Sequence, residues 1–445
     1  MRGGFGRGVV TLATGAGVAQ IIVIATSPIL TRLYGPNDFG TYAVAISLLS
    51  LLLTITCLRF EIAIPLPSSG VAAANLLSLS LVAAIATSFV TALALLGGGT
   101  ALMNLLGAPS LAPYVMILPL GQLGAGVGMA FSGWALRTRS FGSLAATRVT
   151  QGVVLTGTQL ALGLARLGAP GLLVGDAIGR SAGSTRLARA AWRADAALFR
   201  QVSRSGMAAV ASRYRRFPLV TSWSALLATL GQQAPLLLIV AAYGAAIGGQ
   251  YALAARVGAL PLSLVAAAVS QVFVAEAASL VRSKPGEVAY LFRRTTTMLA
   301  AVGVLPALAA IILAPLLAGP VFGAPWAPVG IYLAILMPSL YLEFVVGATG
   351  DVLLVLERQG LHLSREVARF VLIGGAIPLA AALGLTDTGA VMVLSAGRCV
   401  MYLIYGMVSW YAVAKFAASS ARDAQSPVAG PHDGGASAAT GDVVP

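Results

Sequence analysis

The sequence predicts an all-α polytopic membrane protein of about 12 transmembrane helices, arranged in two six-helix lobes with a central cleft. Hydrophobic residues make up 58% of the 445 residues and charged residues only 9%, whereas a soluble domain carries about 25% charged residues. Apolar runs long enough to cross a bilayer recur along the whole chain. A short turn pattern is also repeated at equivalent points of the two halves.

The composition excludes several other classes of protein. Disordered chains are poor in apolar residues, unlike this one. The formal charge is +14, but the basic residues are mostly arginines in short clusters between apolar runs, so nucleic-acid binding is not expected. Cys57 and Cys399 lie in apolar runs, so no disulfide framework is predicted. The apolar stretch 9–33 is too long for the core of a cleaved signal peptide and is predicted to be the first span.

The predicted spans follow from length. A helix needs roughly 20 mostly apolar residues to cross a hydrocarbon core of about 30 Å. Twelve segments fit this rule: 9–33, 39–58, 72–96, 114–136, 143–165, 168–185, 217–243, 250–276, 296–318, 327–350, 367–385 and 388–413. The sixth is the weakest prediction, because Asp176 and Arg180 interrupt it.

The placement of basic residues predicts the orientation of these spans. With a cytoplasmic N-terminus, 22 of the 28 Lys and Arg residues fall on the inner side of the membrane, as the positive-inside rule predicts. The exceptions lie in outer loops or inside spans: Arg32, Arg166, Arg148, Arg256, Arg369 and Arg398. We therefore expect both termini to be cytoplasmic.

Four segments are expected. They are an N-terminal six-helix lobe (1–185), a basic cytoplasmic inter-lobe loop (186–216), a C-terminal six-helix lobe (217–415) and a disordered cytoplasmic tail (416–445). The arginines of the inter-lobe loop orient the chain and attract anionic lipid headgroups. The alternative is that they gather an anionic substrate.

A short pattern relates the two halves at an offset of 209 residues. It consists of Tyr34, Gly35, Gly40, Tyr42 and Ala43 in the first half and of Tyr243, Gly244, Gly249, Tyr251 and Ala252 in the second. Since each half has six spans, the copies run in the same direction, as in carriers with parallel repeats. Two such lobes enclose a cleft that their rocking exposes to either side of the membrane.

The sequence offers little for catalysis or metal binding. It contains no Walker A motif, and His362 and His432 have no partners at metal-ligand spacing. The run Gly124–Gly128 lies inside a predicted span, where glycines serve helix packing. We therefore expect no enzyme activity, no metal and no cofactor.

Charged residues inside the spans are the main candidates for a functional site, because each is costly to place in a membrane. Arg398 lies about ten residues into its span, near mid-membrane at roughly 15 Å depth. It either faces a cavity or pairs with an acid on another helix. Arg256 and Arg148 lie closer to span ends and either snorkel or face the cleft.

Two acids are candidates for ion coupling. Asp176 is four residues from Arg180, so the two side chains share a helix face and either pair or leave Asp176 to carry a proton. Glu343 is the second candidate.

The arginines together predict a cationic cleft. Arg32, Arg59, Arg256 and Arg398 belong to spans one, two, eight and twelve, where the halves should meet, and Arg148 joins them as a further candidate. The planar guanidinium suits phosphate and carboxylate groups. Such a cleft favours an anionic headgroup over an organic cation.

Several segments resemble a known family. They are Leu30–Ala43, Arg59–Pro65, Arg139–Ala145 and Tyr251–Arg256 followed by Leu260-Pro261. These are similar to the outer turn and span ends of bacterial polysaccharide-biosynthesis flippases, the O-antigen-type oligosaccharide flippases of the multidrug/oligosaccharidyl-lipid/polysaccharide (MOP) exporter superfamily. The resemblance covers nearly all of the chain except its tail.

The resemblance implies a MATE-like bundle in the bacterial inner membrane. The implied substrate is an undecaprenyl-diphosphate-linked oligosaccharide, moved from the inner to the outer leaflet for surface polysaccharide synthesis. The implied partners are this polyprenyl-diphosphate lipid, membrane lipids and possible contacts with a polysaccharide polymerase and a chain-length regulator. The alternatives left open are an ion-coupled multidrug exporter of the same fold, a membrane-embedded glycan polymerase and a structural subunit of an export complex.

Overall fold

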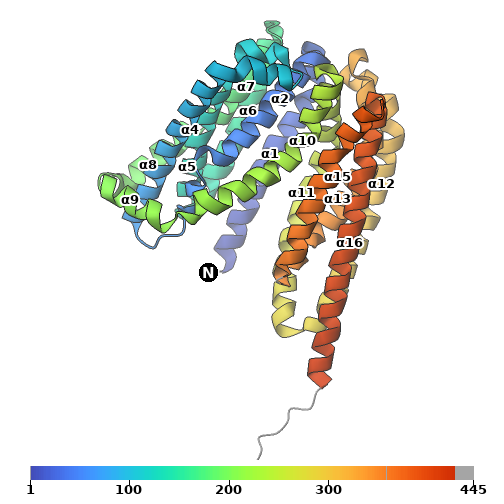
Figure 1. The fold of residues 1–445 in the computed structure, drawn as a ribbon. Helices are drawn as coiled ribbons and strands as arrows, with labels where there is room; N and C mark the ends of the chain where they lie inside the picture. The colour runs from blue at the N-terminus through green and yellow to red at the C-terminus, as the bar shows by residue number, and fades with distance from the viewer. Residues whose placement is uncertain (1, 357, 426–445) are drawn as a thin grey trace, which may run out of the picture.

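The computed structural model describes residues 2–356 and 358–425, and in that part of the chain every regular element is helical. The N-terminal lobe contains α1 (Arg2–Leu33), α2 (Pro36–Thr56), α4 (Gly70–Leu105), α5 (Ile117–Arg137), α6 (Phe141–Leu164) and α7 (Ala169–Ser181). The C-terminal lobe contains α10 (Ser222–Tyr243), α11 (Ala245–Ser283), α12 (Val288–Phe322), α13 (Pro328–Gly350), α15 (Gln359–Ala382) and α16 (Asp387–Gln425). The two lobes stand side by side in Figure 1, and the predicted fold class is confirmed.

Each predicted span corresponds to one of these long helices. By length and composition alone, eight helices among the described residues are long and apolar enough to cross a membrane. The sixth predicted span is the exception in length, because α7 has only 13 residues, about 20 Å at 1.5 Å per residue. Gly183 then turns the chain with a φ of +77°, a backbone conformation that glycine adopts without strain.

The inter-lobe segment, which was expected to be a loop, forms two helices, α8 (Ser184–Phe199) and α9 (Arg204–Arg213). In α8, Leu187 and Ala191 are buried on one face, while the arginines of the helix are exposed. The Nε1–H of Trp134 on α5 donates a hydrogen bond to Asp195 at 3.1 Å. This amphipathic pattern explains the helicity, because the apolar face packs on the N-terminal lobe.

The start of α1 and the end of α16 lie at the same end of the molecule. In Figure 1 the start of α1 and the end of α16 both point downward, and α8 and α9 lie low on the N-terminal lobe. The helix α16 continues to Gln425, ten residues into the segment expected to be a tail. Residues 426–445 lie outside the described part of the chain. We call this end of the molecule the basic end.

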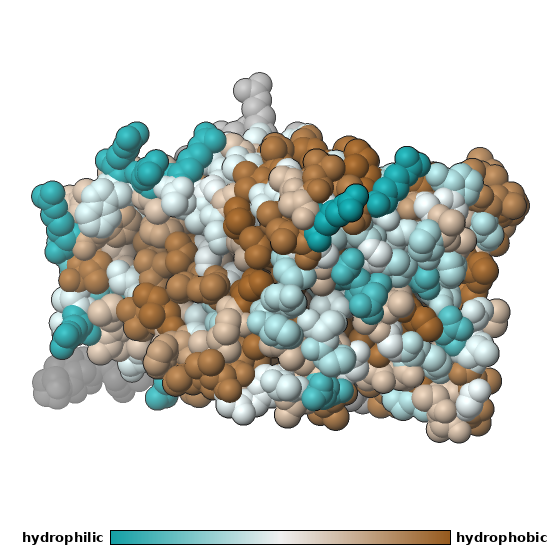
Figure 2. All heavy atoms as spheres, turned by 90° about the horizontal axis from the view of Figure 1, so that it is seen from above, coloured by the Kyte–Doolittle hydropathy of each residue, from teal (hydrophilic) through white to brown (hydrophobic). Residues whose placement is uncertain are grey.

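The lobes meet at the opposite end, which we call the closed end. There α2 and α11 cross so closely that a Cβ atom built on Gly40 would lie 1.7 Å from the carbonyl oxygen of Ala245. A Cβ on Gly249, the repeat-related glycine, would lie 2.1 Å from the carbonyl oxygen of Pro36. Figure 2 views the molecule from this end, where polar residues lie among apolar ones. The absence of side chains at both glycines thus permits direct backbone contact between the lobes.

A buried tryptophan stabilises this contact between the lobes. Trp326, in the short helix η4 (Ala324–Trp326) of the C-terminal lobe, is 1% exposed. Its Nε1–H donates a hydrogen bond to the carbonyl of Thr31 at 2.9 Å, and its ring meets Phe39 edge-on with centroids 4.9 Å apart. The closed end is therefore held by close packing rather than by charge.

Candidate functional site

Two cavities lie below the closed end. The first, which we call the upper chamber, has a volume of about 680 Å³ and lies between α2, α6 and α7 on one side and α10, α11, α13, α15 and α16 on the other. The second, the lower chamber, has a volume of about 960 Å³ and is lined by α1, α2, α5, α6 and α7, the segment 59–65, and one residue of α11. Leu155, Arg180 and Arg256 line both chambers. The junction therefore carries one arginine from each lobe.

The predicted site residues divide between the two chambers, with one exception. Arg256, Arg398, Asp176 and Glu343 line the upper chamber, and Arg59, Arg148 and Arg256 line the lower one. Arg32 lines neither of them: it is exposed, and its guanidinium donates to the carbonyl of Pro320 at 3.4 Å. The structure thus brings six of the seven candidates to two cavities that share lining residues.

Arg398 and Glu343 form an ion pair on the wall of the upper chamber. Arg398 Nη2 on α16 lies 2.5 Å from Glu343 Oε2 on α13, and their side chains are 14% and 43% exposed. The sequence left open whether Arg398 faces a cavity or pairs with an acid, and in the structure it does both. The neighbouring acid offsets the cost of a charge at this depth.

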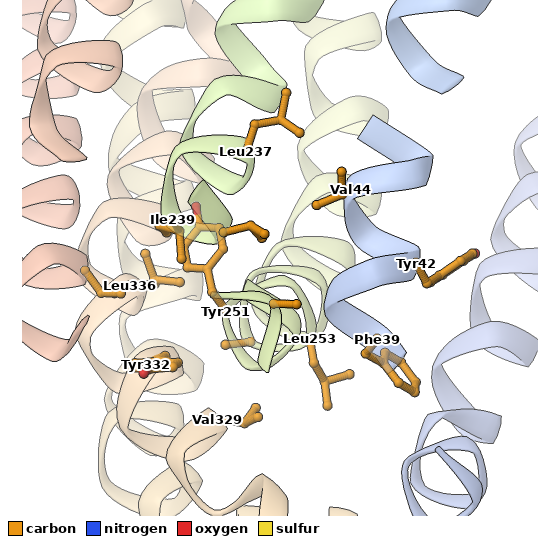
Figure 3. Close-up of a cluster of buried hydrophobic side chains, with 14 of the residues drawn as sticks. Phe39, Tyr42, Val44, Leu237, Ile239, Tyr251, Leu253, Val329, Tyr332 and Leu336 are labelled. Carbon is orange, nitrogen blue, oxygen red and sulfur yellow. The ribbon is translucent and has the colours of Figure 1, made fainter. Parts of the chain in front are cut away.

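A second ion pair lies on the opposite wall. Arg180 Nε lies 2.5 Å from Asp176 Oδ2, and Tyr42 donates to the other carboxylate oxygen at 3.1 Å. Tyr251, which is related to Tyr42 by the internal repeat, lines the same chamber from the C-terminal lobe. In Figure 3, Tyr42 and Tyr251 point away from each other, each toward its own lobe. Each lobe therefore brings a tyrosine and an arginine–carboxylate pair to the upper chamber.

The lower chamber contains a looser pair at the end of α2. Arg59 Nη1 lies 4.0 Å from Glu61 Oε1, and Glu61 is largely buried. Burial raises the pKa of the Glu61 carboxyl, while its own backbone N–H and Arg59 act in the opposite direction. Arg59 itself has a φ of 62°, a left-handed conformation that a non-glycine residue rarely adopts. The chain thus turns sharply at the residue that presents this guanidinium.

Arg256 and Arg148 differ from these pairs. Neither forms an ion pair with an acid of the described residues, and Arg148 donates only to the side-chain oxygen of Gln151, at 3.5 Å. The charged residues that line the two chambers are Arg59, Arg148, Arg180, Arg256, Arg369 and Arg398 with Glu61, Asp176 and Glu343. The positive charge of the cavities is therefore only partly balanced, and it is least balanced where Arg256 and Arg148 lie.

Sequence reasoning missed several residues that line the upper chamber. Arg369, which the sequence placed inside a span but not among the site candidates, is one of them. The others are neutral polar groups, among them Gln232 and Gln233 of α10 and Tyr402 of α16. The two consecutive glutamines in an apolar run could have indicated a polar cavity, because amides are costly to bury without partners.

Comparisons with known proteins identify the family and the fold. The model of the family described as "Polysaccharide biosynthesis protein" matches residues 29–330. No curated protein sequence matches the chain. Among solved structures, the fold is similar to the lipid II flippase MurJ in an inward closed conformation, with a TM-score of 0.68 and 12% identity over 93% of this chain and 91% of that one.

Two further structures share this fold. One is an inward-facing multidrug resistance MATE family transporter of the MOP superfamily, with a TM-score of 0.60 and 15% identity over 92% of this chain and 96% of that chain. The other is the Vibrio cholerae MATE transporter VcmN, with a TM-score of 0.56 and 15% identity over 93% and 97% of the two chains. Because the family model covers well over half of the sequence, the chain belongs to the polysaccharide biosynthesis protein family, and it shares the fold of these solved structures.

Proposed function

We propose that the protein is a flippase for undecaprenyl-diphosphate-linked oligosaccharides. It moves these lipids from the inner to the outer leaflet of the bacterial inner membrane by alternating access through the two chambers. The observation that carries this proposal is that Arg256 and Arg148, which line the chambers, have no acidic partner among the described residues. Guanidinium groups bind phosphate through two parallel hydrogen bonds, so a diphosphate would supply the charge that the cavity lacks.

The basic end faces the cytoplasm in this proposal. The exposed arginines of α8 and α9 then lie at the inner leaflet, whose anionic lipids attract them. The described conformation, sealed at the closed end, would receive substrate from the cytoplasmic side. A polysaccharide polymerase and a chain-length regulator would act on the product after it reaches the outer leaflet.

A multidrug exporter of the same fold is the alternative. Such a carrier for organic cations requires acids that are free to bind cations or protons. Asp176 and Glu343, the two candidate acids, are each 2.5 Å from an arginine. These ion pairs favour an anionic substrate over a cationic one.

The test follows lipid-linked oligosaccharides in cells that lack the gene. We expect completed units to be trapped on the inner leaflet and surface polymer to be lost. Arg256→Gln should restore about tenfold less polymer than the wild type at equal protein level, because a hydrogen bond to a charged group contributes about 1.5–3 kcal/mol. Arg282→Gln, at an exposed position outside both chambers, is the matched control and should restore it fully.

Two other results would overturn the proposal. Completed units that reach the outer leaflet but stay unpolymerised would identify a polymerase. Unchanged glycan in the deletion strain would leave the drug exporter as the function to test.

A further inference from the structure

A separate groove lies in the C-terminal lobe between α12, α13 and α16, and we call it the lateral groove. Its volume is about 280 Å³, less than half that of either chamber, and none of its lining residues lines a chamber. We propose that the lateral groove binds one anionic phospholipid of the inner leaflet, with the phosphate at Arg293 and an acyl chain along the apolar walls. This site is outside the chambers, so the inference goes beyond the proposed function.

The lateral groove takes one face from each of its three helices. The helices α12 and α16 both pack on α13, and the three run side by side in Figure 1. Residues three or four positions apart lie on the same face of a helix. Each helix supplies such a pair: Phe292 and Thr296 of α12, Val346 and Thr349 of α13, and Gly406 and Trp410 of α16. The two α13 residues are buried, so α13 forms the floor and the other two helices form the walls.

The groove lies at the depth where phospholipid headgroups meet the hydrocarbon core. Arg293 comes three residues before the start of its predicted span, Thr349 one residue before the end of its span, and Trp410 three residues before the end of its span. All three span ends are on the cytoplasmic side in the orientation proposed above. Arginine at the inner side and tryptophan at the interface are both typical of this depth. Lipids of the inner leaflet therefore reach the groove directly.

Arg293 gives the groove a positive charge that no acid balances. Its side chain is exposed and forms no ion pair with an acid of the described residues. Glu287, the acid nearest to it in the sequence, is paired with Lys284 at 3.1 Å. A guanidinium binds a phosphate through two parallel hydrogen bonds. The groove therefore favours an anionic lipid over a zwitterionic one, whose ammonium group would lie beside the arginine.

A threonine one turn from Arg293 offers a further donor. The hydroxyls of Thr296 and Thr349 are 3.4 Å apart, which is long for a hydrogen bond between two hydroxyls. Thr349 also lies 3.5 Å from the carbonyl oxygen of Val346, to which it can donate instead. Thr297, by contrast, donates to backbone carbonyls of its own helix at 2.9 and 3.1 Å. The Thr296 hydroxyl can therefore turn to a phosphate oxygen, which is a stronger acceptor than a hydroxyl.

Apolar side chains continue from the groove toward the membrane interior. Trp410 is 45% exposed, and its ring contacts that of Phe292 with centroids 6.1 Å apart. Deeper in the predicted spans, large hydrophobic side chains stay exposed on both walls: Met298, Val302 and Leu305 on α12, and Leu403 and Met407 on α16. They recur every three or four residues, so they form one stripe on each helix. An acyl chain attached to a phosphate at Arg293 would lie between these stripes.

The test titrates the purified full-length protein in detergent with phosphatidylglycerol or phosphatidylethanolamine and counts the bound lipids by native mass spectrometry. The wild type should bind one phosphatidylglycerol about tenfold more tightly than one phosphatidylethanolamine, because the ammonium of the second lipid would be repelled by Arg293. Arg293→Gln should weaken phosphatidylglycerol about tenfold, since hydrogen bonds to a charged group are lost. Thr296→Val should weaken it by a smaller factor. Arg294→Gln and Thr295→Val, on the same helix but outside the groove, are the matched controls and should leave binding unchanged.

A second variant fills the groove without changing its charge. A Cβ atom on Gly406 would lie 3.4 Å from Cγ2 of Val346, an ordinary contact, so the helices can still pack in Gly406→Leu. The longer side chain would occupy the groove, and we expect it to weaken phosphatidylglycerol at least as much as Arg293→Gln does. Gly375→Leu is the matched control, because Gly375 is exposed on α15 and a Cβ atom there meets nothing within 4 Å. Gel filtration of each variant would confirm that it is folded.

Three results would overturn the inference. Equal weakening by Arg293→Gln and Arg294→Gln would mean that only the overall surface charge attracts the lipid. Unchanged binding in Gly406→Leu would place the lipid outside the groove. Displacement of phosphatidylglycerol by an equal concentration of glycerol phosphate, which has no acyl chains, would mean that the groove binds a free phosphate and not a lipid. The flippase proposal stands in each case, because the residues of the lateral groove line neither chamber.

Discussion

The two lobes face each other with different kinds of residue at the closed end and at the chambers. At the closed end, Gly40 and Gly249 allow backbone to touch backbone, and Trp326 is buried between the lobes. At the junction of the chambers, Arg180 and Arg256 approach from opposite lobes and carry like charges. The packing at the closed end depends on shape and acts only at short range, whereas the like charges at the junction repel each other and would be offset by a bound anion. Steric substitutions should therefore affect the closed end, and charge substitutions should affect the chambers.

The largest effect is expected from a methyl group at the closed end. Gly40→Ala places a Cβ atom 1.7 Å from the carbonyl oxygen of Ala245, so α2 and α11 must move apart. Overpacking costs about 1–3 kcal/mol, enough to shift the equilibrium away from this closed arrangement by roughly tenfold or more. The distance between spin labels at Asn37 and Ala246, with both native cysteines replaced, should lengthen, and export should fall.

The matched control for this substitution is Gly157→Ala. Gly157 is also in a helix of the N-terminal lobe, but a Cβ atom there meets nothing within 4 Å. Equal label distances and equal export in the two variants would contradict the role assigned to the glycine crossing.

A second effect, on the stability of the protein rather than on the closed arrangement, is expected from the Arg398–Glu343 ion pair in the wall of the upper chamber. Glu343→Gln leaves Arg398, the more buried partner, without its acid. Arg398→Gln leaves the more exposed carboxylate of Glu343 without its arginine. We expect Glu343→Gln to lower the free energy of unfolding by about 1–3 kcal/mol, less than for a fully buried pair. The double variant should recover part of this loss, and thermal unfolding in detergent measures each form.

The exposed pair Lys284–Glu287 provides the control for this comparison. Its side chains are 67% and 55% exposed, so Glu287→Gln should leave the unfolding temperature almost unchanged. If the loss of unfolding free energy in the double variant equals the sum of the losses in the two single variants, Arg398 and Glu343 do not interact. Arg398→Gln should also reduce export, since the guanidinium lines the chamber.

The sequence predicted the helices better than it predicted the contacts between them. Span length and hydropathy depend on consecutive residues, so the helices that match the twelve predicted spans in the described part of the chain could be located from the sequence alone. The pairing of Arg398 with Glu343 joins residues 55 positions apart, and no local pattern specifies it. The helicity of α8 was missed because the segment is not apolar enough for a span, although its buried face is regular.

The sequence predicted the charged residues of the candidate site and missed the uncharged ones. Arg256 and Arg148 were found because any arginine in a span is costly. Gln232 and Tyr251 carry no charge, so whether they line a cavity depends on which helix face meets it, and this is fixed only when the lobes pack. Arg32 failed to join the others because it lies at the closed end of its helix, beyond the chambers.

The smallest effect is expected from Trp326→Phe, which separates the two contacts of this side chain. Phenylalanine keeps a ring against Phe39 but removes the Nε1–H that donates to the carbonyl of Thr31. A buried hydrogen bond contributes about 0.5–1.5 kcal/mol, so the population with a lengthened distance between the labels at the closed end should rise severalfold, and less than in Gly40→Ala. Trp223→Phe, at a position 64% exposed, is the control and should leave the distances unchanged. An effect of Trp326→Phe as large as that of Gly40→Ala would mean that the hydrogen bond, and not the glycine crossing, holds the lobes together.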